Sequence, residues 1–238
     1  MSRHPAPILP ETKLVVFDCD GTLVDSAHLI VAAMRSALAQ CGITEVGGEA
    51  VRRIIGLSLN EAVGALLPAT MEAARDVAVS HYRDAYRALA ARPDLRPPLF
   101  PGVRAMLETL AAGDCLLGIA TGKSAQGMRR TLQEHDLGHL FATVRTADDG
   151  PGKPHPTMLR RAMDEAGVEP AETVLIGDTT FDVTMARAAG ATAVGVAWGY
   201  HPATELAAAG ALHIVQSCAE VAPLVLARRG DPWRAVDS

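Results

Sequence analysis

The chain has 238 residues, of which 49% are hydrophobic, and its formal net charge is −5. This length provides for one large or two small domains with a sizeable core. The acidic balance disfavours broad binding to nucleic acids or anionic membranes, and the sequence contains no run of about 18 apolar residues that would predict a membrane span, so we expect neither partner.

The first predicted strand delivers two carboxylates to its C-terminal end. The apolar run Leu14–Phe17 is followed by Asp18 and Asp20, and Gly21 then permits a sharp turn. Acidic residues are depleted in strands, and clustered anionic charge has to be paired, metal-bound or neutralised when it is buried. The pair therefore indicates a metal site or an acid–base site.

Residues 25–98 have helical spacing and no clear buried strand. Apolar side chains at Ile30, Met34 and Leu38 recur at helical intervals and form one stripe, and a long Ala-rich helix is predicted from Met71 to Ala91. Prolines at positions 93, 97, 98 and 101 mark the return of the chain. We expect residues 25–98 to form an all-α domain inserted into a core made of residues 1–24 and 99–238.

The remainder of the chain alternates between apolar runs and helical segments. The apolar runs predict strands at Cys115–Ala120, Val174–Ile176 and Ala193–Ala197. Helical spacing predicts helices at Val103–Ala111, Ser124–His135, Pro156–Ala166 and Phe181–Ala189. Continuous apolar runs are typical of strands covered on both faces. The predicted fold class is therefore α/β, with an open, doubly wound parallel sheet that binds ligands at the carboxyl ends of its strands.

Four motifs follow one another along the chain. Residues 17–26 read FDCDGTLVDS, Thr121 and Gly122 follow the second predicted strand, Lys153 precedes Pro154 in a loop, and residues 177–182 read GDTTFD. In this order the motifs resemble those of the haloacid dehalogenase superfamily, in its phosphatase branch. The resemblance spans essentially the whole chain, and it implies a Rossmann-like core with residues 25–98 as an inserted cap domain.

The resemblance implies a phosphomonoester hydrolase that works through an aspartyl-phosphate. Asp18 would be the nucleophile, and Asp20 would protonate the leaving oxygen and then activate water. Thr121 and the amide of Gly122 would contact phosphate oxygens. Lys153 would neutralise both the phosphate and Asp18.

The same resemblance implies Mg²⁺ as the cofactor. A dianionic substrate is repelled by clustered carboxylates unless a cation intervenes, and Mg²⁺ is a hard cation that takes oxygen ligands and keeps several waters. We expect Asp18, the backbone carbonyl of Asp20 and Asp178 to bind it. Asp182 would hold a metal-bound water or orient a ligand.

Two adjacent arginines bear on the substrate. Arg52 and Arg53 precede Ile54–Ser58, which resembles the cap substrate loop of phosphoglycolate phosphatase-like members, as residues 195–200 also do. An arginine there would pair with a carboxylate or another anionic group, although adjacent arginines are also common on solvated helix faces, and at most one is expected to point inward. The implied substrate is a small phosphorylated metabolite, with phosphoglycolate as the first candidate.

The cysteines and the N-terminus bear on the setting of the protein. Cys19, Cys41, Cys115 and Cys218 form no Cys-x-x-Cys pair, and residues 1–12 lack the apolar core of a secretory signal. We expect reduced thiols in a cytoplasmic protein that is a monomer or a homodimer. Because negative charge on both sides disfavours its thiolate, Cys19 is not expected to be a nucleophile.

Other chemistries fit the sequence less well. Residues 118–124 read GIATGKS and have one residue too few between the glycines for a Walker A loop. Lys123 is therefore expected to be a solvated lysine at a helix start, or to lie near the mouth of the site. His135 and His139 have a possible zinc spacing, but Gly138 interrupts their helix.

Within the superfamily, two alternatives stay open. Beta-phosphoglucomutases carry a cap histidine where this chain has Ile30, with His28 nearby, so a phosphomutase is disfavoured but not excluded. A non-catalytic binding module is also disfavoured, since the charged motif residues are all present. Dehalogenases lack the acid that is Asp20 here, and phosphonoacetaldehyde hydrolases use a cap lysine, which residues 25–98 do not contain.

Overall fold

The computed structural model describes residue 9 and residues 11–227. In these residues, six parallel strands form one sheet in the order β3-β2-β1-β4-β5-β6. The chain extends from the central β1 to β2 and β3, then returns to the other side of β1, so the order of the strands switches beside β1. The strands are β1 (Leu14–Phe17), β2 (Leu116–Ala120), β3 (Thr143–Arg145), β4 (Thr173–Gly177), β5 (Thr192–Val196) and β6 (His213–Val215).

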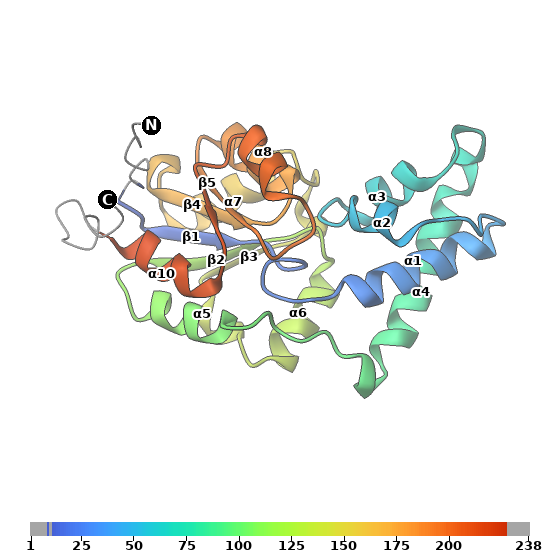
Figure 1. Ribbon diagram of the computed structural model, residues 1–238, viewed down its shortest axis with the longest axis horizontal. Coiled ribbons are helices and arrows are strands. Elements are labelled where there is room, and N and C mark those ends of the chain that lie inside the picture. The colour runs from blue at the N-terminus through green and yellow to red at the C-terminus, as the bar shows by residue number, and fades with distance from the viewer. Residues whose placement is uncertain (1–8, 10, 228–238) are drawn as a thin grey trace.

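Helices cover both faces of the sheet, because side chains alternate between the two faces of a strand. Val15 and Phe17 of β1 belong to the core on one face, which α5 and α10 complete, whereas Leu14 and Val16 belong to the other, which α7, α8 and α9 complete. Figure 1 shows these two helical layers above and below the strands. The helices after the first 100 residues are α5 (Val103–Ala111), α6 (Ala125–Glu134), α7 (Thr157–Ala166), α8 (Thr180–Ala189), α9 (Ala203–Ala209) and α10 (Cys218–Leu226).

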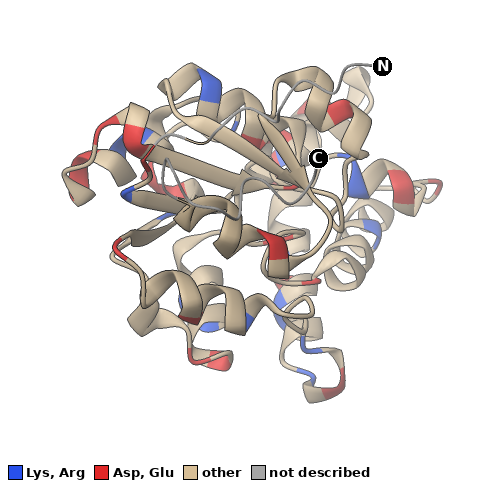
Figure 2. Cartoon of the chain, turned by 60° about the vertical axis from the view of Figure 1, so that its left-hand side comes forward, with Lys and Arg blue, Asp and Glu red and all other residues tan. Residues whose placement is uncertain are grey.

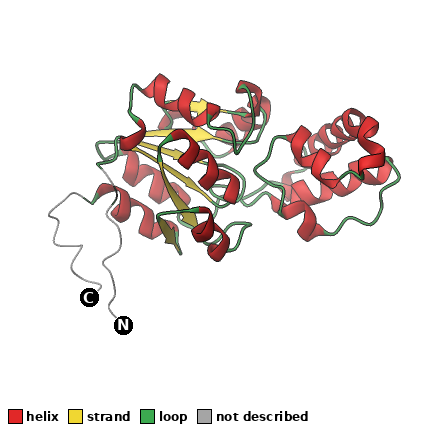
Figure 3. Cartoon of the chain, turned by 90° about the horizontal axis from the view of Figure 1, so that it is seen from above, coloured by secondary structure: helices red, strands yellow, loops and turns green. Residues whose placement is uncertain are grey.

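A helical insertion, residues 25–98, lies between β1 and α5. It holds α1 (Ala27–Gln40), α2 (Gly48–Arg52), α3 (Leu59–Leu66) and α4 (Arg75–Ala90). These helices have a hydrophobic core of their own, to which Ile30, Met34 and Leu38 contribute as their spacing predicts. Figure 3 shows the insertion as a separate group of helices beside the sheet, joined to it by loops.

The predicted helix from Met71 to Ala91 is wrong at its N-terminal end. A 3-10 segment spans Ala69–Ala74, and Met71 leaves helical geometry with φ −112° and ψ 17°. The α-helix therefore begins only at Arg75. Elsewhere the predicted helices after residue 100 agree with the structure to within one residue at each end.

Two strands were not predicted, and both are short. β3 and β6 have three residues each and lie at the two edges of the sheet. Strands of this length give too few positions for a periodic pattern. Gly167 and Gly190 end α7 and α8 with φ of 65° and 83°, a left-handed conformation that glycine adopts without a steric penalty.

Charged residues are spread over the molecule. Figure 2 shows Lys and Arg scattered among Asp and Glu along the helices and loops. In the part of the chain that the structure describes, no helix has the length and apolar character needed to cross a membrane.

Candidate active site

Three adjacent strands place the predicted site residues at the carboxyl end of the sheet. Asp18 follows β1, Thr121 follows β2, and Asp178 follows β4. Because β2, β1 and β4 are neighbours and parallel, their carboxyl ends meet beside the point where the strand order switches. The structure therefore brings together side chains that are up to 160 residues apart in the sequence.

A buried acidic cluster lies at the carboxyl ends of these strands. Carboxylate oxygens of Asp18, Asp178 and Asp182 all lie within 4.8 Å of one another, and each residue is at most 1% exposed. The Nζ atom of Lys153, which is fully buried, lies 2.7 Å from Oδ1 of Asp18 and 2.6 Å from Oδ1 of Asp182. The cluster thus contains three acids, two of which contact one ammonium group.

Asp18 has a buried carboxylate oxygen that no hydrogen-bond donor among the described residues contacts. Its Oδ2 atom is buried and accepts no hydrogen bond from any described residue. Burial raises the pKa of Asp18 to about 7, although the charge of Lys153 opposes the shift. A buried carboxylate oxygen without a donor is costly, so this atom is poised to contact a group that the protein itself does not supply.

Asp178 is held in place by one side-chain donor and one backbone donor. Its Oδ1 accepts a hydrogen bond from the hydroxyl of Thr22 at 2.8 Å, and its Oδ2 accepts one from the amide of Tyr200 at 2.9 Å. Burial and the charge of Asp18 raise its pKa. Gly21 and Gly199 allow this close approach, because a Cβ atom on either would lie 2.2 or 2.1 Å from atoms of Asp178.

Asp182 uses its two oxygens for two different contacts. Oδ2 accepts hydrogen bonds from the amide of Thr179 at 3.1 Å and from its hydroxyl at 2.6 Å, which forms the capping box of α8. Oδ1 contacts Lys153. In this structure Asp182 therefore orients Lys153 and caps a helix.

Asp20 pairs with Lys123, a lysine whose contact with this carboxylate the sequence did not predict. Its Oδ1 lies 2.8 Å from Nζ of Lys123 and accepts a hydrogen bond from the hydroxyl of Ser26. Of the two expectations for Lys123, the solvated lysine is wrong, because its side chain is only 9% exposed, and a position near the site is confirmed, because Lys123 lines the cavity described below. One signal was available, since the chain contains only three lysines, at positions 13, 123 and 153.

A cavity of about 850 Å³ opens above these residues and is lined by both parts of the chain. Asp18, Asp20, Thr121 and Gly122 line it from the core. The helical insertion contributes mainly apolar and aromatic walls: Ile30, Met34, Ile54, Ile55, Leu57, Leu59, Tyr82 and Tyr86. The insertion also contributes Ser58, Asn60, Glu61, Arg83 and Arg87, so its wall of the cavity combines apolar and charged side chains.

The structure does not bring Arg52 and Arg53 to this cavity. Arg52 contacts Glu49 at 3.5 Å on its own helix, and Arg53 pairs with Glu205 at 2.7 Å. The carbonyl of Arg53 also lies 3.1 Å from Nε2 of His201. The cations that do line the cavity are Arg83, Arg87, Lys123 and Arg130, so the arginine expected to face the site docks the insertion on the core instead.

The loop after α2 packs directly on the core. A Cβ atom on Gly122 would lie 2.6 Å from the carbonyl oxygens of Gly56 and Leu57, and one on Gly56 would lie 3.2 Å from Oγ1 of Thr179. The backbone of the insertion therefore covers the loop that follows β2. Only a residue without a side chain fits at Gly122.

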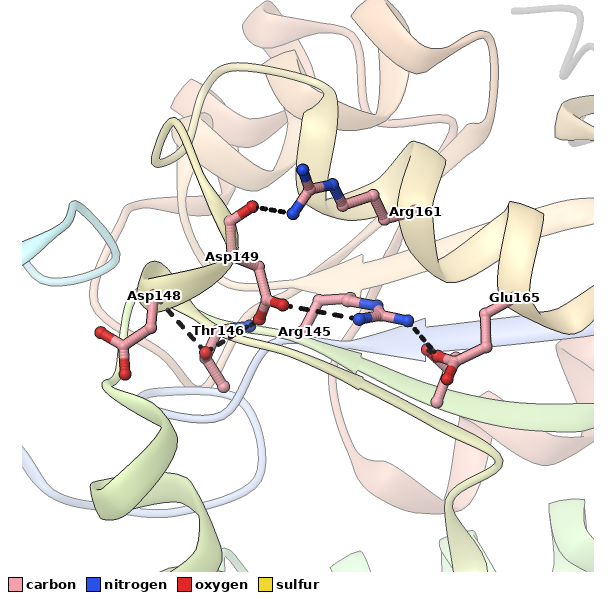
Figure 4. Close-up of polar contacts among 7 residues, drawn as sticks. Arg145, Thr146, Asp148, Asp149, Arg161 and Glu165 are labelled. Atoms are coloured by element: carbon pink, nitrogen blue, oxygen red, sulfur yellow. Dashed lines mark hydrogen bonds and ion pairs between the residues drawn. The ribbon is translucent and has the colours of Figure 1, made fainter.

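The loop that carries Lys153 is fixed by a network around Arg145. Figure 4 shows Arg145 between Asp149 and Glu165, with its guanidinium 3.5 Å and 2.5 Å from their carboxylates. Thr146 forms a capping box with Asp149, and Arg161 donates to the carbonyl of Asp149. These contacts hold residues 145–149, and hence the start of the loop that leads to Lys153.

The structure also bears on the other chemistries. Gly118 lies inside β2, which leaves no Walker-type loop. His135 and His139 belong to no group of three metal-ligating side chains among the described residues. Ile30 lines the cavity, whereas Nε2 of His28 lies 3.1 Å from the carbonyl of Leu95, so the histidine near the mutase position does not reach the cavity.

Two further expectations concern Cys19 and the segment around Trp198. Burial and the charge of Asp20 raise the pKa of the Cys19 thiol, which disfavours a nucleophilic role. Trp198 packs against the core and donates its indole N–H to the carbonyl of Thr22 at 3.1 Å. His201 accepts from the amide of Thr180 at 3.1 Å and joins α8 to the insertion through Arg53.

Comparisons with known proteins agree with this geometry. The sequence profile described as haloacid dehalogenase-like hydrolase matches residues 15–196. The probable phosphatase IndB of Dickeya dadantii is 38% identical over 212 residues, which are 87% of this chain and 91% of that protein. A phosphoglycolate phosphatase of Pseudomonas putida is 32% identical over 196 residues, which are 79% of this chain and 71% of that protein.

Solved structures show the same architecture. A predicted phosphatase from Clostridium acetobutylicum has a TM-score of 0.78 at 26% identity and covers 92% of this chain and 99% of its own. A putative haloacid dehalogenase-like hydrolase from Bacteroides fragilis has a TM-score of 0.78 at 28% identity and covers 88% of this chain and 99% of its own. The chain therefore belongs to the haloacid dehalogenase-like hydrolase family and is a phosphatase of that family.

Proposed function

We propose that the protein hydrolyses the phosphate monoester of a small metabolite through an aspartyl-phosphate on Asp18, with Mg²⁺ as its cofactor. The observation that carries this proposal is the buried Oδ2 atom of Asp18, which lacks a hydrogen-bond donor and belongs to a carboxylate 2.7 Å from Lys153. A nucleophile of this kind needs a lone pair that no hydrogen bond occupies and a nearby cation that offsets the charge of the phosphate. Asp18 has both.

The donor set fits a divalent cation. The site contains four buried carboxylates, on Asp18, Asp20, Asp178 and Asp182. Two ammonium groups, on Lys123 and Lys153, pair with them, so two negative charges are uncompensated when all four carboxylates are ionised. Hard oxygen donors with such an excess are what Mg²⁺ prefers. Asp18, Asp178 and the backbone carbonyl of Asp20 would hold the ion.

When bound, Mg²⁺ would supply charge compensation for the phosphate oxygens. Lys153 would add to this compensation, since its Nζ already contacts Asp18. Asp182 would keep Lys153 oriented, because its Oδ1 is 2.6 Å from that Nζ. Thr121 and Gly122, which line the cavity beside Asp18, would bind phosphate oxygens.

The chemistry would proceed in two displacements at phosphorus. In the first, a carboxylate oxygen of Asp18 forms a bond to phosphorus while the bond to the leaving oxygen breaks, and Asp20 gives its proton to that oxygen. In the second, Asp20 takes a proton from water as the water oxygen bonds to phosphorus. The Asp18–phosphorus bond then breaks and inorganic phosphate is released.

The helical insertion would act as a cap that receives the leaving group. Its wall of apolar and charged side chains lines the cavity opposite the carboxylates, and its loop at Gly56 and Leu57 covers Gly122, an arrangement suited to excluding water. Phosphoglycolate is the first substrate to test, because curated relatives carry that activity in their names. Arg83 would meet its carboxylate, because among the described residues Arg87 pairs with Asp84 and Arg130 with Glu134, whereas Arg83 forms no ion pair. A cavity of about 850 Å³ also admits larger esters.

The proposal is tested by phosphate release with and without Mg²⁺. The panel would hold phosphoglycolate, sugar phosphates, nucleotides, pyrophosphate and an aryl phosphate. We expect Mg²⁺-dependent release from one preferred ester, and radiolabelled phosphate retained on acid-quenched wild-type protein but not on Asp18→Asn. Release from Asp18→Asn at the wild-type rate would contradict the nucleophile assignment. No release from any ester by folded wild-type protein would contradict the proposed function.

A further inference from the structure

Lys123 joins the core to the helical insertion at the edge of the cavity. Its Nζ atom lies 2.8 Å from Oδ1 of Asp20 and 5.7 Å from the centre of the Tyr86 ring on α4. The side chains of Lys123 and Asp20 are 9% and 10% exposed. A largely desolvated ammonium group on an aromatic face is attracted to it, so one cation holds a carboxylate of the core and a ring of the insertion together.

The backbone of Lys123 is fixed on both sides. Its amide donates a hydrogen bond to Oγ1 of Thr121 at 3.2 Å, and its carbonyl accepts one from the amide of Ala147 at 3.1 Å. Only its side chain is therefore free to change position. The position of the ammonium group is set by its two partners, Asp20 and Tyr86.

The neighbouring helix leaves space for this side chain. Gly127 lies in α6, and a Cβ atom there would be 3.0 Å from Cγ and 3.3 Å from Cδ of Lys123. Glycine inside a helix costs about 1 kcal/mol relative to alanine. Alanine at position 127 would therefore stabilise α6, but its methyl group would displace the stem of Lys123.

Composition supports a specific need for lysine here. Of the 22 basic residues only three are lysines, and two of these, Lys123 and Lys153, are the cations that contact carboxylates in the site. Lysine presents a compact charge on a flexible stem, whereas arginine presents a wide planar fork. A compact ammonium group fits between one carboxylate oxygen and one ring.

We propose that Lys123 is a positioning residue that orients the carboxyl group of Asp20 and couples this orientation, through Tyr86, to the seating of the helical insertion on the core. The inference rests on the proposed function, in which Asp20 is the general acid. Ser26, the second partner of Oδ1, lies immediately before α1. Both contacts of this oxygen therefore involve residues that are linked to the insertion, and Asp20 adopts its orientation when the insertion is in place.

The proposal predicts a dependence on the leaving group. A general acid accelerates departure of a basic alkyl alkoxide strongly and departure of an acidic phenol weakly. Misorientation of Asp20 should therefore reduce kcat/KM for an alkyl phosphate more than for p-nitrophenyl phosphate. A general structural defect would lower both values by the same factor, so the ratio of the two distinguishes the two effects.

The experiment compares this ratio among matched variants of the full chain with Mg²⁺. We expect Lys123→Met to lower the ratio of alkyl to aryl kcat/KM by about tenfold or more, within the range that positioned acids contribute. Lys123→Arg should restore part of the loss. Tyr86→Leu should lower the ratio in the same direction, and Tyr86→Phe, which keeps the ring, should lower it less.

Three further variants separate positioning from stability. Gly127→Ala keeps the ammonium group and favours α6, so a lower ratio without a lower Tm would reflect displacement of Lys123. On an Asp20→Asn background, Lys123→Met should lower the ratio no further, because the acid that it orients is gone. Lys13→Met removes an exposed lysine paired with Glu172 and should leave the ratio unchanged.

The outcomes distinguish the two proposals. An active wild-type protein whose ratio is unchanged in both Lys123→Met and Gly127→Ala would overturn the positioning role and leave the proposed function standing. A further fall in the ratio on the Asp20→Asn background would also overturn it. Absence of phosphate release by the wild type from either ester would overturn the proposed function itself, and the role of Lys123 with it.

Discussion

The Nζ atom of Lys153 lies 2.6 Å from Oδ1 of Asp182, and the two side chains are 0% and 1% exposed. Asp18 is the second carboxylate that contacts this Nζ, so loss of the Asp182 charge leaves Lys153 with one partner and should cost less than the about 3–5 kcal/mol of a fully unpaired buried charge. Asp182→Asn keeps an oxygen that can accept from Thr179 but loses the charge that holds Lys153. We expect a fall in kcat of at least about tenfold and a lower Tm, measured by phosphate release and thermal unfolding. Asp182→Ala, which also loses the capping oxygen, should be less stable by about 1 kcal/mol more. Wild-type kcat in Asp182→Asn would show that Lys153 does not need this partner.

Asp18 should make the stability of the metal-free protein depend on pH. Its pKa rises from 3.8 in the unfolded chain to about 7 in the native state, so the native state alone binds this proton between about pH 4 and pH 7. The contribution of this group is therefore complete below pH 4 and is lost as the pH rises through 7. In EDTA, Asp18→Asn should have a higher Tm than the wild type, by a smaller margin at pH 5 than at pH 8, because the wild type loses this contribution progressively as the pH rises from about 4 to about 7. A Tm difference that stays constant over this range would contradict the shift.

The stabilisation by Mg²⁺ should increase with pH, whereas the contribution of Asp18 to the stability of the metal-free protein decreases. The ion binds ionised carboxylates, so it should stabilise the wild type more at pH 8 than at pH 5. Asp18→Asn and Asp178→Asn should lose most of this stabilisation. The measurement is the change in Tm with Mg²⁺ concentration at the two pH values, with Ca²⁺ as a competing ion. Equal stabilisation of the wild type and both variants would place the ion elsewhere.

Gly122 should tolerate no side chain. In Gly122→Ala the new methyl group would lie 2.6 Å from the carbonyl oxygens of Gly56 and Leu57, so the loop of the insertion has to move away from the core. We expect a higher KM and a lower kcat for every ester, with a small change in Tm. Gly47→Ala is the matched control, because nothing lies within 4 Å of its added Cβ. Wild-type kinetics in Gly122→Ala would mean that contact of this loop with the core is not needed for turnover.

Arg53 and Arg83 should affect different properties. Arg53 pairs with Glu205 at 2.7 Å outside the cavity, so Arg53→Met should change activity on all esters by the same factor. Arg83 lines the cavity, is exposed and forms no ion pair with any described residue. Arg83→Met should raise KM for esters with a carboxylate and leave p-nitrophenyl phosphate unaffected. A change of substrate preference in Arg53→Met but not in Arg83→Met would restore the interpretation made from the sequence.

The contrast between Lys153 and Lys123 shows how far sequence reasoning reaches. Lys153 was expected beside Asp18, because a motif in the right order gives it a place. Lys123 stands two residues after Thr121, yet nothing local indicates that its side chain turns toward Asp20, 103 residues earlier. Tyr86 of α4 lies beside the same ammonium group, and only the tertiary structure brings it there.

The contacts of the arginines also could not be predicted from the sequence. Arg52 and Arg53 stand in a segment that resembles a substrate loop, but the partner of Arg53 is Glu205 on α9, more than 150 residues away. A side chain of this length can point to either face of its loop, and the nearest available charge decides which. Arg83 and Arg130, on α4 and α6, line the cavity without any motif to mark them.

The sequence by itself determined the sheet, the helical insertion and the acids at the strand ends, because periodicity and Asp-x-Asp-Gly are local properties of the chain. It did not determine the short edge strands β3 and β6, the break at Met71 or the partners of the charged side chains. Only the tertiary structure decided which carboxylate each lysine contacts and which arginines reach the cavity. The physical reason is that a buried charge is stabilised by whatever opposite charge the fold brings within a few ångströms, and that distance is not encoded in the spacing of residues along the chain.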